Sequence, residues 1–208
     1  MAHGLMSSLT SERGSGNSET DLIAHPIITQ KWIPHILCGQ KRWKVFSGSW
    51  NKTANKIIYR QEPEVLTGEN IAVIGSTDWS NYALKIDFKI ITESIKPPEG
   101  GAILYYNFRN MKNYYSLHFC HAKQTIEIIK RFRGEWKTIA EQDFNIETHK
   151  DNNVRINTAA GIHTFMINGA HALEIKDEDI SKGCIGLGIK YCDAAFSRVT
   201  AAFRQAIK

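Results

Sequence analysis

The sequence has few of the residues and patterns that mark several common protein classes. No run of about eighteen apolar residues occurs along its 208 residues, which excludes an ordinary transmembrane helix. Only 5 prolines and 15 glycines occur, beside 42% hydrophobic and 23% charged residues, which excludes a collagen-like or wholly disordered chain. At this length we expect one domain, large enough to bury a stable core without cross-links.

Cysteine is also scarce, and its spacing predicts no metal site. The four cysteines are far apart, with no C-x-x-C pair and no histidines at a zinc-type spacing: Cys38, Cys120, Cys184 and Cys192. A local Cys184–Cys192 disulfide is one alternative, but we favour four free, mostly buried thiols. The sequence also lacks a Gly-x-Ser-x-Gly nucleophile elbow and a glycine-rich phosphate loop.

Basic residues are in modest excess, and their distribution argues against nucleic-acid binding. The formal net charge is +5, but residues 1–60 hold 8 Lys and Arg against 3 Asp and Glu, while residues 61–208 hold 18 of each. Nucleic-acid domains gather basic side chains on one face, often with aromatic partners. The excess here is spread thinly, so we expect no nucleic-acid partner and no membrane span.

From about Asp21 onward, short apolar or alternating runs are separated by turn signals. Residues 1–20 are rich in Ser, Gly and Thr and predict a disordered tail, while residues 21–208 predict a single domain. The runs are rich in Ile, Val, Tyr, Phe and Thr, which favour strands. The clearest are 83–91, 102–109, 114–120, 125–132, 136–140, 154–158, 163–167, 184–190 and 195–202.

The turn signals indicate antiparallel pairing. Asn168-Gly169 is the strongest of them, because both central residues of a type I′ hairpin turn need a positive φ. Only the segment 198–208 is a fair helix candidate, since no other window combines helical periodicity with caps. We therefore predict an all-β fold, a sandwich of two antiparallel sheets.

Alternation along two of these runs predicts a face with hydrogen-bonding groups and aromatic rings. Successive side chains of a strand point to opposite faces, and the short loop between 102–109 and 114–120 makes the two runs hairpin neighbours. The less apolar sides then merge into one patch: Tyr105, Asn107, Arg109, Tyr114, Ser116 and His118. Such a patch suits a sugar, whose ring stacks while its hydroxyls form hydrogen bonds. The alternative is an ordinary solvated sheet face.

A series of short motifs follows one order along the chain, each of them weak alone. They are Gly48-Ser49-Trp50, Tyr59-Arg60-Gln61, Asp78-Trp79-Ser80-Asn81-Tyr82-Ala83-Leu84, Gly100-Gly101-Ala102-Ile103-Leu104-Tyr105, Asn113-Tyr114-Tyr115-Ser116-Leu117, Arg133-Gly134-Glu135-Trp136-Lys137, Asn152-Asn153-Val154-Arg155-Ile156, Phe165-Met166-Ile167-Asn168-Gly169 and Ser181-Lys182-Gly183-Cys184-Ile185-Gly186-Leu187. Over residues 40–200 this order resembles the concanavalin A-like lectin/glucanase superfamily. The resemblance is greatest to laminin G-like carbohydrate-binding modules and keto-disaccharide-hydrolase-like domains.

The resemblance implies a jelly-roll sandwich with one concave sheet, in which many members bind glycans. Two positions depart from the family pattern. Tyr106-Asn107 stands where relatives carry Phe-Arg, with Arg109 two residues later, and Phe196-Ser197 stands where relatives carry Phe-Asp. In relatives that bind calcium that acid helps to hold the ion; serine is a poor substitute, even with Asp193 nearby, so we expect no cofactor.

A glycoside hydrolase on the same fold is one alternative. It needs two carboxyl groups close together, and the nearest sequence match, Glu141-Gln142-Asp143-Phe144-Asn145-Ile146-Glu147, is one residue too long. A second alternative is a protein-interaction domain, since laminin G-like sandwiches also bind proteins, which predicts a large exposed apolar patch. We assign no catalytic residue. The sequence predicts non-catalytic carbohydrate recognition on the polar, concave face, with Trp79 and Trp136 as further candidates for contact.

Overall fold

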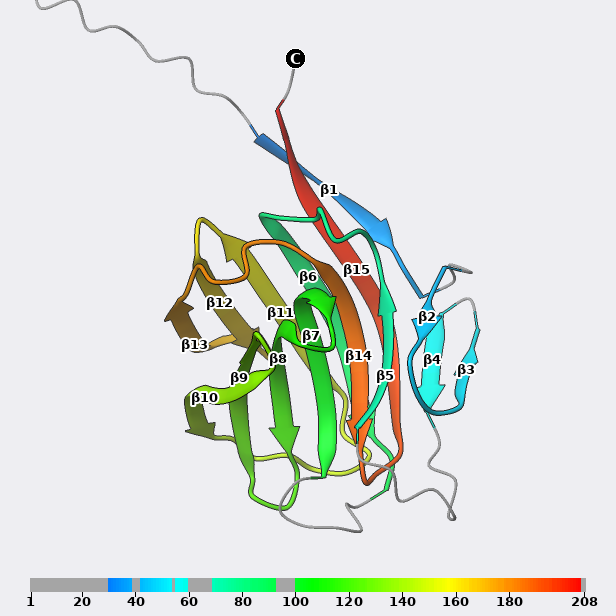
Figure 1. Cartoon of the computed structure of the whole chain (residues 1–208). Coiled ribbons are helices and arrows are strands. Elements are labelled where there is room, and N and C mark those ends of the chain that lie inside the picture. The colour runs from blue at the N-terminus through cyan, green and yellow to red at the C-terminus, as the bar shows by residue number, and fades with distance from the viewer. Residues whose placement is uncertain (1–29, 39–41, 54, 60–68, 93–99, 207–208) are drawn as a thin grey trace, which may run out of the picture.

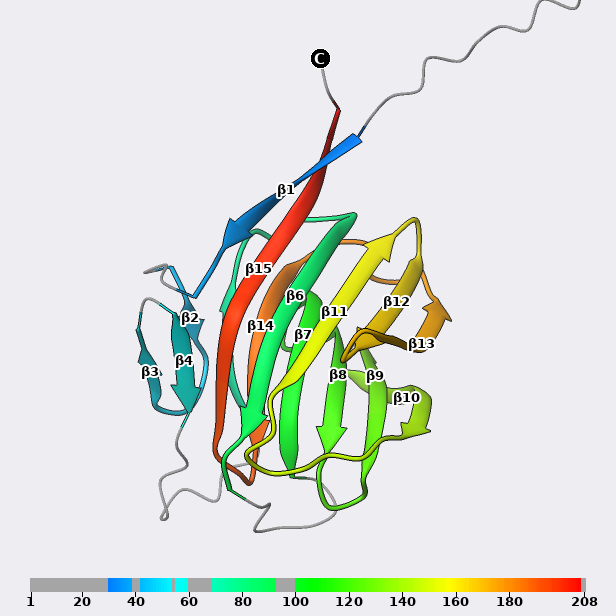
Figure 2. The same ribbon diagram turned by 180° about the vertical axis from the view of Figure 1, so that it is seen from behind.

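Two antiparallel sheets packed face to face make up the described part of the chain (Figures 1 and 2). The computed structural model describes residues 30–38, 42–53, 55–59, 69–92 and 100–206. The predicted tail, residues 1–20, lies outside them. The described residues contain strands and turns but no helix, so the predicted all-β sandwich of two antiparallel sheets is confirmed. No described helix is long and apolar enough to cross a membrane.

The first sheet has eight strands and pairs segments that are far apart along the chain. Its order is β13 (Ala170–Lys176), β12 (Ile162–Ile167), β11 (Asn152–Ala159), β6 (Tyr82–Ile90), β15 (Ala194–Ala206), β4 (Lys56–Tyr59) and β3 (Trp50–Lys52), with β1 (Gln30–Ile36) also paired to β15. Figure 2 shows this sheet from its outer side. These non-local pairings tie the two ends of the described chain together.

The second sheet has seven strands and carries the predicted binding face. Its order is β10 (Glu135–Asp143), β9 (Thr125–Phe132), β8 (Asn113–Cys120), β7 (Gly101–Asn110), β14 (Cys184–Lys190), β5 (Glu69–Ile74) and β2 (Lys44–Val45). Its outer side faces the viewer in Figure 1. Strands β7 to β10 follow one another as hairpins, whereas β14 arrives from late in the chain and separates β7 from β5.

The main core lies between the sheets and follows the alternation expected from the sequence. In β8 the inward side chains Tyr115, Leu117 and Phe119 are fully buried. Phe119 meets Phe88 of the opposite sheet with ring centroids 4.4 Å apart. Aromatic contacts of this kind add to the free energy gained by burying apolar surface.

The predicted hairpin is confirmed, and the one helix candidate is a strand. Asn168 and Gly169 have φ values of 52° and 84°, as a type I′ turn requires, between β12 and β13. The segment 198–208 continues β15 as far as Ala206, because pairing with β6 and β1 outweighs its local helical preference. Arg198, at φ 47°, lies where the register with β6 shifts.

All four cysteines are free thiols, as we favoured. Cys38, Cys120 and Cys192 are buried and Cys184 is partly exposed. Burial raises the pKa of Cys120 and of Cys192 to about 12, so both remain protonated at neutral pH. They therefore act as small apolar groups of the core.

Candidate functional site

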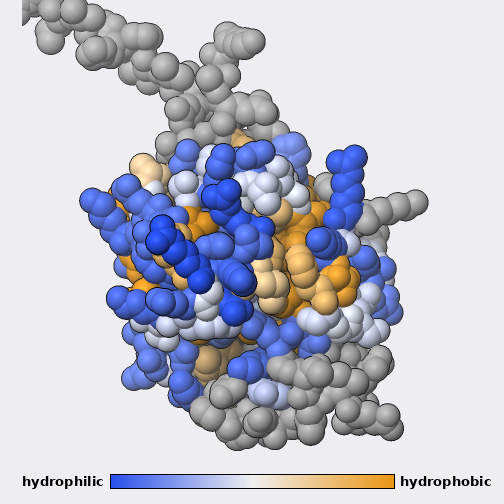
Figure 3. Space-filling model, in the orientation of Figure 1, coloured by the Kyte–Doolittle hydropathy of each residue, from blue (hydrophilic) through white to orange (hydrophobic). Residues whose placement is uncertain are grey.

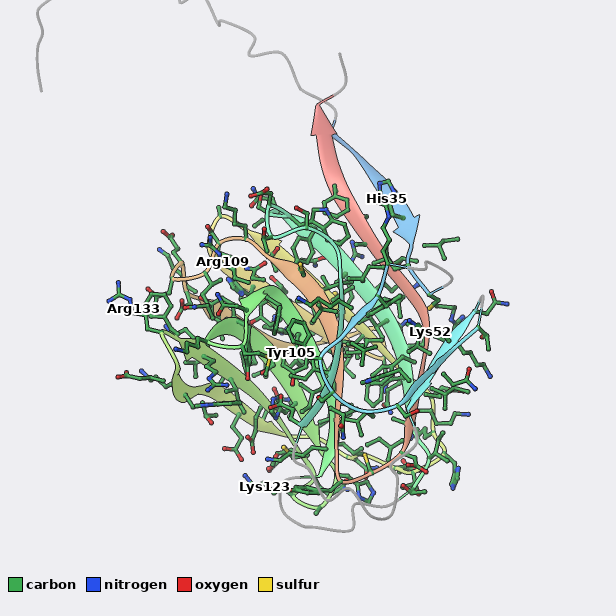
Figure 4. The ribbon with its side chains drawn as sticks, turned by 45° about the vertical axis from the view of Figure 1, so that its right-hand side comes forward. His35, Lys52, Tyr105, Arg109, Lys123 and Arg133 are labelled. Carbon is green, nitrogen blue, oxygen red and sulfur yellow. The ribbon has the colours of Figure 1, made fainter. Side chains whose placement is uncertain are left out.

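The outer face of the seven-stranded sheet holds four of the six predicted residues. Tyr114, Ser116 and His118 alternate with the core side chains of β8, and Tyr105 of β7 is directly opposite Ser116. Ser116 Oγ and His118 Nε2 are 3.0 Å apart. Figure 4 shows Tyr105 near the middle of this face. We call this surface the outer tyrosine face.

Asn107 does not lie on this face, contrary to the prediction. Its φ of 47° is left-handed, and the register between β7 and β8 shifts after Tyr106, which marks a β-bulge. The bulge turns Asn107 inward, where its Nδ2 donates to Ile180 O at 2.7 Å and its Oδ1 accepts from Tyr82 OH at 3.0 Å. Asparagine adopts left-handed φ more readily than most residues, which is why this position tolerates the bulge.

The bulge also changes the positions of the next two residues. Phe108 lies on the outer face, although strict alternation predicted it in the core. Arg109 is exposed near the end of β7, beyond the bulge, and Figure 4 shows it well apart from Tyr105. The prediction that Arg109 extends one patch with Tyr105 is therefore wrong in its geometry.

The tyrosine rings are packed, so neither offers an open surface for stacking. Tyr105 and Tyr114 are fully buried, with their rings edge to face at 5.2 Å, and Phe108 stacks on Tyr114 at 5.5 Å. Gly188 provides room for this packing, because a Cβ there would lie 2.6 Å from the Tyr105 ring. These residues belong to a second apolar cluster: Ile71, Val73, Ile103, Tyr105, Phe108 and Tyr114. Figure 3 shows apolar surface on this side of the molecule, bordered by polar side chains.

Three buried oxygens on this face lack a hydrogen-bond partner among the described residues. They are Tyr105 OH, Tyr114 OH and Glu69 Oε1. Glu69 begins β5 and is opposite Lys190 of β14. A buried oxygen without a partner costs about 1–3 kcal/mol, so three on one face call for an explanation.

Burial and neighbouring charges shift the pKa values of the titratable groups on this face. Burial raises the pKa of Glu69 to about 7, although Lys190 and Arg131 both act to lower it. Burial and then the Glu69 charge raise the pKa of Tyr114, although the neighbouring Arg131 acts to lower it, so the hydroxyl keeps its proton. Burial, with Lys190 as a second cause, lowers the pKa of His118 to about 3, so its ring is neutral at physiological pH. The face therefore offers neutral donors and acceptors beside one acid that titrates near neutrality.

Trp136 is the exposed aromatic side chain next to this group. It lies on β10 opposite Arg131 of β9 and is about half exposed, at 49%. The Arg131 guanidinium lies 4.6 Å above its ring, and its edge meets Tyr114 at 5.8 Å. Trp79, the other candidate, packs instead on Phe203 at 4.8 Å and over Gly75, where a Cβ would lie 2.4 Å from its ring.

The acidic residues considered for catalysis do not converge. Glu141 and Asp143 are exposed on the edge strand β10, and Glu147 is exposed in the loop beyond it, paired with Lys150 at 2.6 Å. A hydrolase needs two carboxyl groups facing one substrate bond. This segment therefore resembles a solvated edge.

The surroundings of Ser197 do not fit a calcium ion. Calcium needs several hard oxygen ligands around one point, and no cluster of three acidic, His or Cys side chains occurs among the described residues. Asp87, opposite Ser197 across the sheet, is already held by Asn153 and Arg198. We derive no function through a metal.

Three contributors to the site were missed from the sequence: Glu69, Arg131 and Lys190. Arg131 is opposite Tyr114, so the β8–β9 hairpin register would have found it. Glu69 and Lys190 depend on β14 lying between β7 and β5, a pairing of distant segments that no local pattern indicates.

Comparison with known proteins identifies the fold through structure alone. No protein-family model and no curated protein matches the sequence. The carbohydrate-binding module CBM66 from Bacillus subtilis is similar, with a TM-score of 0.68 and 18% identity over 80% of this chain and 99% of its own. A Bacillus subtilis protein of unknown function with a galectin-like fold has a TM-score of 0.63 and 16% identity, covering 85% of this chain and 100% of its own.

A mannose-bound domain and a hydrolase are also among the similar structures. The exoplasmic/lumenal domain of VIP36, bound to calcium and mannose, has a TM-score of 0.62 and 12% identity over 84% of this chain and 91% of its own. A glycosidic hydrolase has a TM-score of 0.62 and 8% identity, covering 87% of this chain and 99% of its own. At such identities the likeness concerns the fold. The chain has the two-sheet fold of the concanavalin A-like lectin/glucanase superfamily.

Proposed function

We propose that this protein binds carbohydrate without cleaving it, through the outer tyrosine face and Trp136. The observation that carries the proposal is the set of three unpartnered buried oxygens beside a half-exposed tryptophan. Sugar hydroxyls donate and accept hydrogen bonds, while the C–H faces of a sugar ring stack on aromatic surfaces. The similar structures of CBM66 and VIP36 support a carbohydrate ligand by analogy of fold.

The roles of the residues differ from those predicted. Trp136 provides the stacking surface in place of the tyrosine rings, and the tyrosines contribute their hydroxyls. The Ser116–His118 pair offers a further neutral group. Since these oxygens are buried, binding includes a displacement of the surface side chains over them, such as Arg131, which is opposite Tyr114. That displacement keeps the affinity modest.

A glycan array with the purified chain, with and without calcium, tests this proposal. Each glycan that binds is then titrated by calorimetry against the chain and against Trp136→Ala. The variant removes a central aromatic contact, so we expect about a 30-fold loss of affinity. Arg155→Ala, an exposed change on the other sheet, is the matched control. Binding by both variants at unchanged affinity would place the glycan elsewhere.

One observation favours a second function, glycoside hydrolysis. A carboxyl group with a pKa of about 7, as Glu69 has, suits a general acid. Each bound glycan is therefore also incubated with the chain and analysed for cleavage. Turnover that Glu69→Gln abolishes while binding persists would replace recognition by hydrolysis; no turnover supports recognition.

A further inference from the structure

A pocket of about 340 Å³ lies on the outer side of the eight-stranded sheet, whereas the outer tyrosine face belongs to the other sheet. It lies over β15, between the end of β1, the turn that joins β3 to β4, and the middle of β6 (Figure 2). Its volume is near the lower end of the range of small-molecule sites in proteins. The pocket is lined by Ile36, Cys38, Asn55, Lys85, Arg198 and Thr200.

A β-bulge in β15 forms one side of the pocket. The register between β15 and β6 shifts around Arg198, whose φ of 47° is left-handed. A left-handed φ is unfavourable for a long side chain, so contacts must hold this backbone. Leu37 N–H donates to Val199 O at 2.9 Å, and Val199 N–H donates to Cys38 Sγ at 3.2 Å. The end of β1 therefore fixes the bulge and, with it, the position of Arg198.

Arg198 is anchored in a way that leaves part of its guanidinium group unused. Its Nε pairs with the carboxylate of Asp87, a buried side chain of β6, while the Arg198 side chain is 77% exposed. One carboxylate engages one edge of the planar guanidinium group. The edge formed by the two Nη groups remains for a second oxyanion, which it can bind through two parallel hydrogen bonds.

Lys85 brings a second positive charge to the same pocket. It lies on the outer face of β6, two residues before Asp87, and it is directly opposite Thr200 of β15. Lys85 is exposed and forms no ion pair with a described residue. No acidic side chain is among the described residues that line the pocket, so its net charge is positive even though Asp87 neutralises Arg198. Such a pocket attracts an anion.

The opposite side of the pocket is apolar. Ile36 of β1 is directly across from Thr200, so Lys85, Thr200 and Ile36 form one row across three strands. Ile36 is 71% exposed, the largest exposed fraction among the large apolar side chains of the described residues. A ligand that covers it gains the free energy of burying apolar surface. The row spans two strand spacings, about 10 Å, which an anion with a short hydrocarbon chain can bridge.

We propose that this pocket binds a small organic carboxylate. The carboxylate lies between the Nη edge of Arg198 and the Lys85 ammonium group, and its hydrocarbon chain lies against Ile36. The net single positive charge matches a monoanion better than a phosphate monoester, which is largely a dianion at neutral pH. The site lies on another sheet from the outer tyrosine face and does not depend on the function proposed above.

Titration of the nitrogen-labelled full chain with hexanoate, followed by amide NMR, tests this proposal. We expect saturable shifts of the amides of residues 36–38, 85 and 198–200, with an affinity in the millimolar range. Hexanol lacks the charge and acetate lacks the chain, so each should bind at least about tenfold more weakly than hexanoate. No saturable shift with hexanoate, or equal binding of inorganic phosphate, overturns the proposal.

Two variants test the two ends of the site separately. Lys85→Met keeps the alkyl chain but removes the charge, and should weaken hexanoate binding about tenfold. Ile36→Ser removes the apolar contact and should weaken it several-fold. Lys89→Met is the matched control, because Lys89 lies on the same strand and face, about 13 Å along β6 and outside the pocket lining.

Thermal unfolding of each variant separates a loss of binding from a loss of structure. Lys85 and Ile36 are exposed, so we expect both variants to unfold close to the temperature of the parent chain. An unchanged affinity in Lys85→Met and Ile36→Ser would place hexanoate elsewhere and overturn the proposal. An equal loss in Lys89→Met would show attraction to the general positive charge of this face, and would also overturn it.

Discussion

The outer face of each sheet holds one buried or partly buried acidic side chain, and the two acids differ in their contacts. On the eight-stranded sheet Asp87 is 2% exposed and is held by Asn153 on one side and Arg198 on the other. On the seven-stranded sheet Glu69 is partly buried with Oε1 unpaired, beside two unpaired tyrosine hydroxyls. Asp87 Oδ2 also lacks a hydrogen bond, but an arginine pairs with it, whereas no ion pair reaches Glu69 Oε1 among the described residues. A buried acid held by an amide and a cation serves the structure, whereas a carboxyl oxygen with neither is open to a partner from outside.

Removing Asp87 should give the largest effect, because this acid has a structural role. Asp87→Ala leaves Asn153 without its acceptor and Arg198 without its ion pair, so we expect a loss of about 2–3 kcal/mol in the free energy of unfolding. Urea denaturation at neutral pH measures it. Glycan affinity should not change in this variant. If Asp87→Ala were as stable as the parent chain, the contacts of Asp87 with Asn153 and Arg198 would not stabilise the fold. Asp87 would then have no structural role to set against Glu69.

The tyrosine hydroxyls allow the same comparison with a smaller change. Tyr82→Phe removes a hydroxyl that both donates to Asn107 Oδ1 and accepts from Asn107 N–H, so we expect a loss of about 2 kcal/mol. Tyr105→Phe removes a hydroxyl that has no partner among the described residues, so it should cost nothing, or stabilise the chain by about 1 kcal/mol. Tyr114→Phe removes a hydroxyl that interacts with Arg131 alone, so it should cost little.

Binding should show the opposite order. Under the proposed function each of Tyr105→Phe and Tyr114→Phe should weaken glycan binding several-fold, while Tyr82→Phe should leave it near the parent value. Calorimetric titration of the three variants with one glycan from the array measures these affinities. Destabilised Tyr105→Phe and Tyr114→Phe variants with normal binding would show that the hydroxyls have structural partners instead.

The hairpin strands of this face could be predicted from sequence, because their geometry is local. Alternation in β8 placed Tyr114, Ser116 and His118 correctly, and the short turn placed β7 beside it. The error at Asn107 has a local cause that alternation ignores: one left-handed residue adds a bulge and reverses the sides of the residues after it. Asparagine in a strand pattern was the available signal.

Other parts of the site could not be predicted, since they depend on distant pairing. Glu69 reaches this face because β14 lies between β7 and β5, and the helix candidate 198–208 is a strand as far as Ala206 because β6 and β1 pair with it. The ring packing of Tyr105 needs a glycine at Gly188, on another strand. Sequence patterns indicate on which face of a strand a residue lies, but not which distant strand pairs with that strand.

The titration of Glu69 should change the free energy of unfolding by about 1–2 kcal/mol, a figure that is reduced because the side chain is partly exposed. Its pKa is about 7 in the folded chain against an ordinary value of 4.5, so between these values the folded state binds more protons than the unfolded state. Stability therefore falls as pH rises from about 4.5 to about 7. Glu69→Gln should lack this fall, measured by urea denaturation of both chains across that range. If the stability of the parent chain and that of Glu69→Gln changed with pH in the same way, the pKa of Glu69 would not be raised by folding.

Arg155→Ala provides the smallest expected effect and fixes the baseline for the rest. Arg155 is exposed on the outer side of the eight-stranded sheet, where its Nε donates to Asn157 Oδ1 at 3.1 Å. An exposed hydrogen bond exchanges readily with water, so we expect a change in stability within about 0.5 kcal/mol and unchanged glycan binding. Thermal unfolding and calorimetry measure both quantities. A loss of binding here would place the glycan on the eight-stranded sheet, where Arg198 already pairs with the buried acid. A buried acid without an ion pair would then no longer distinguish a binding face from a structural one.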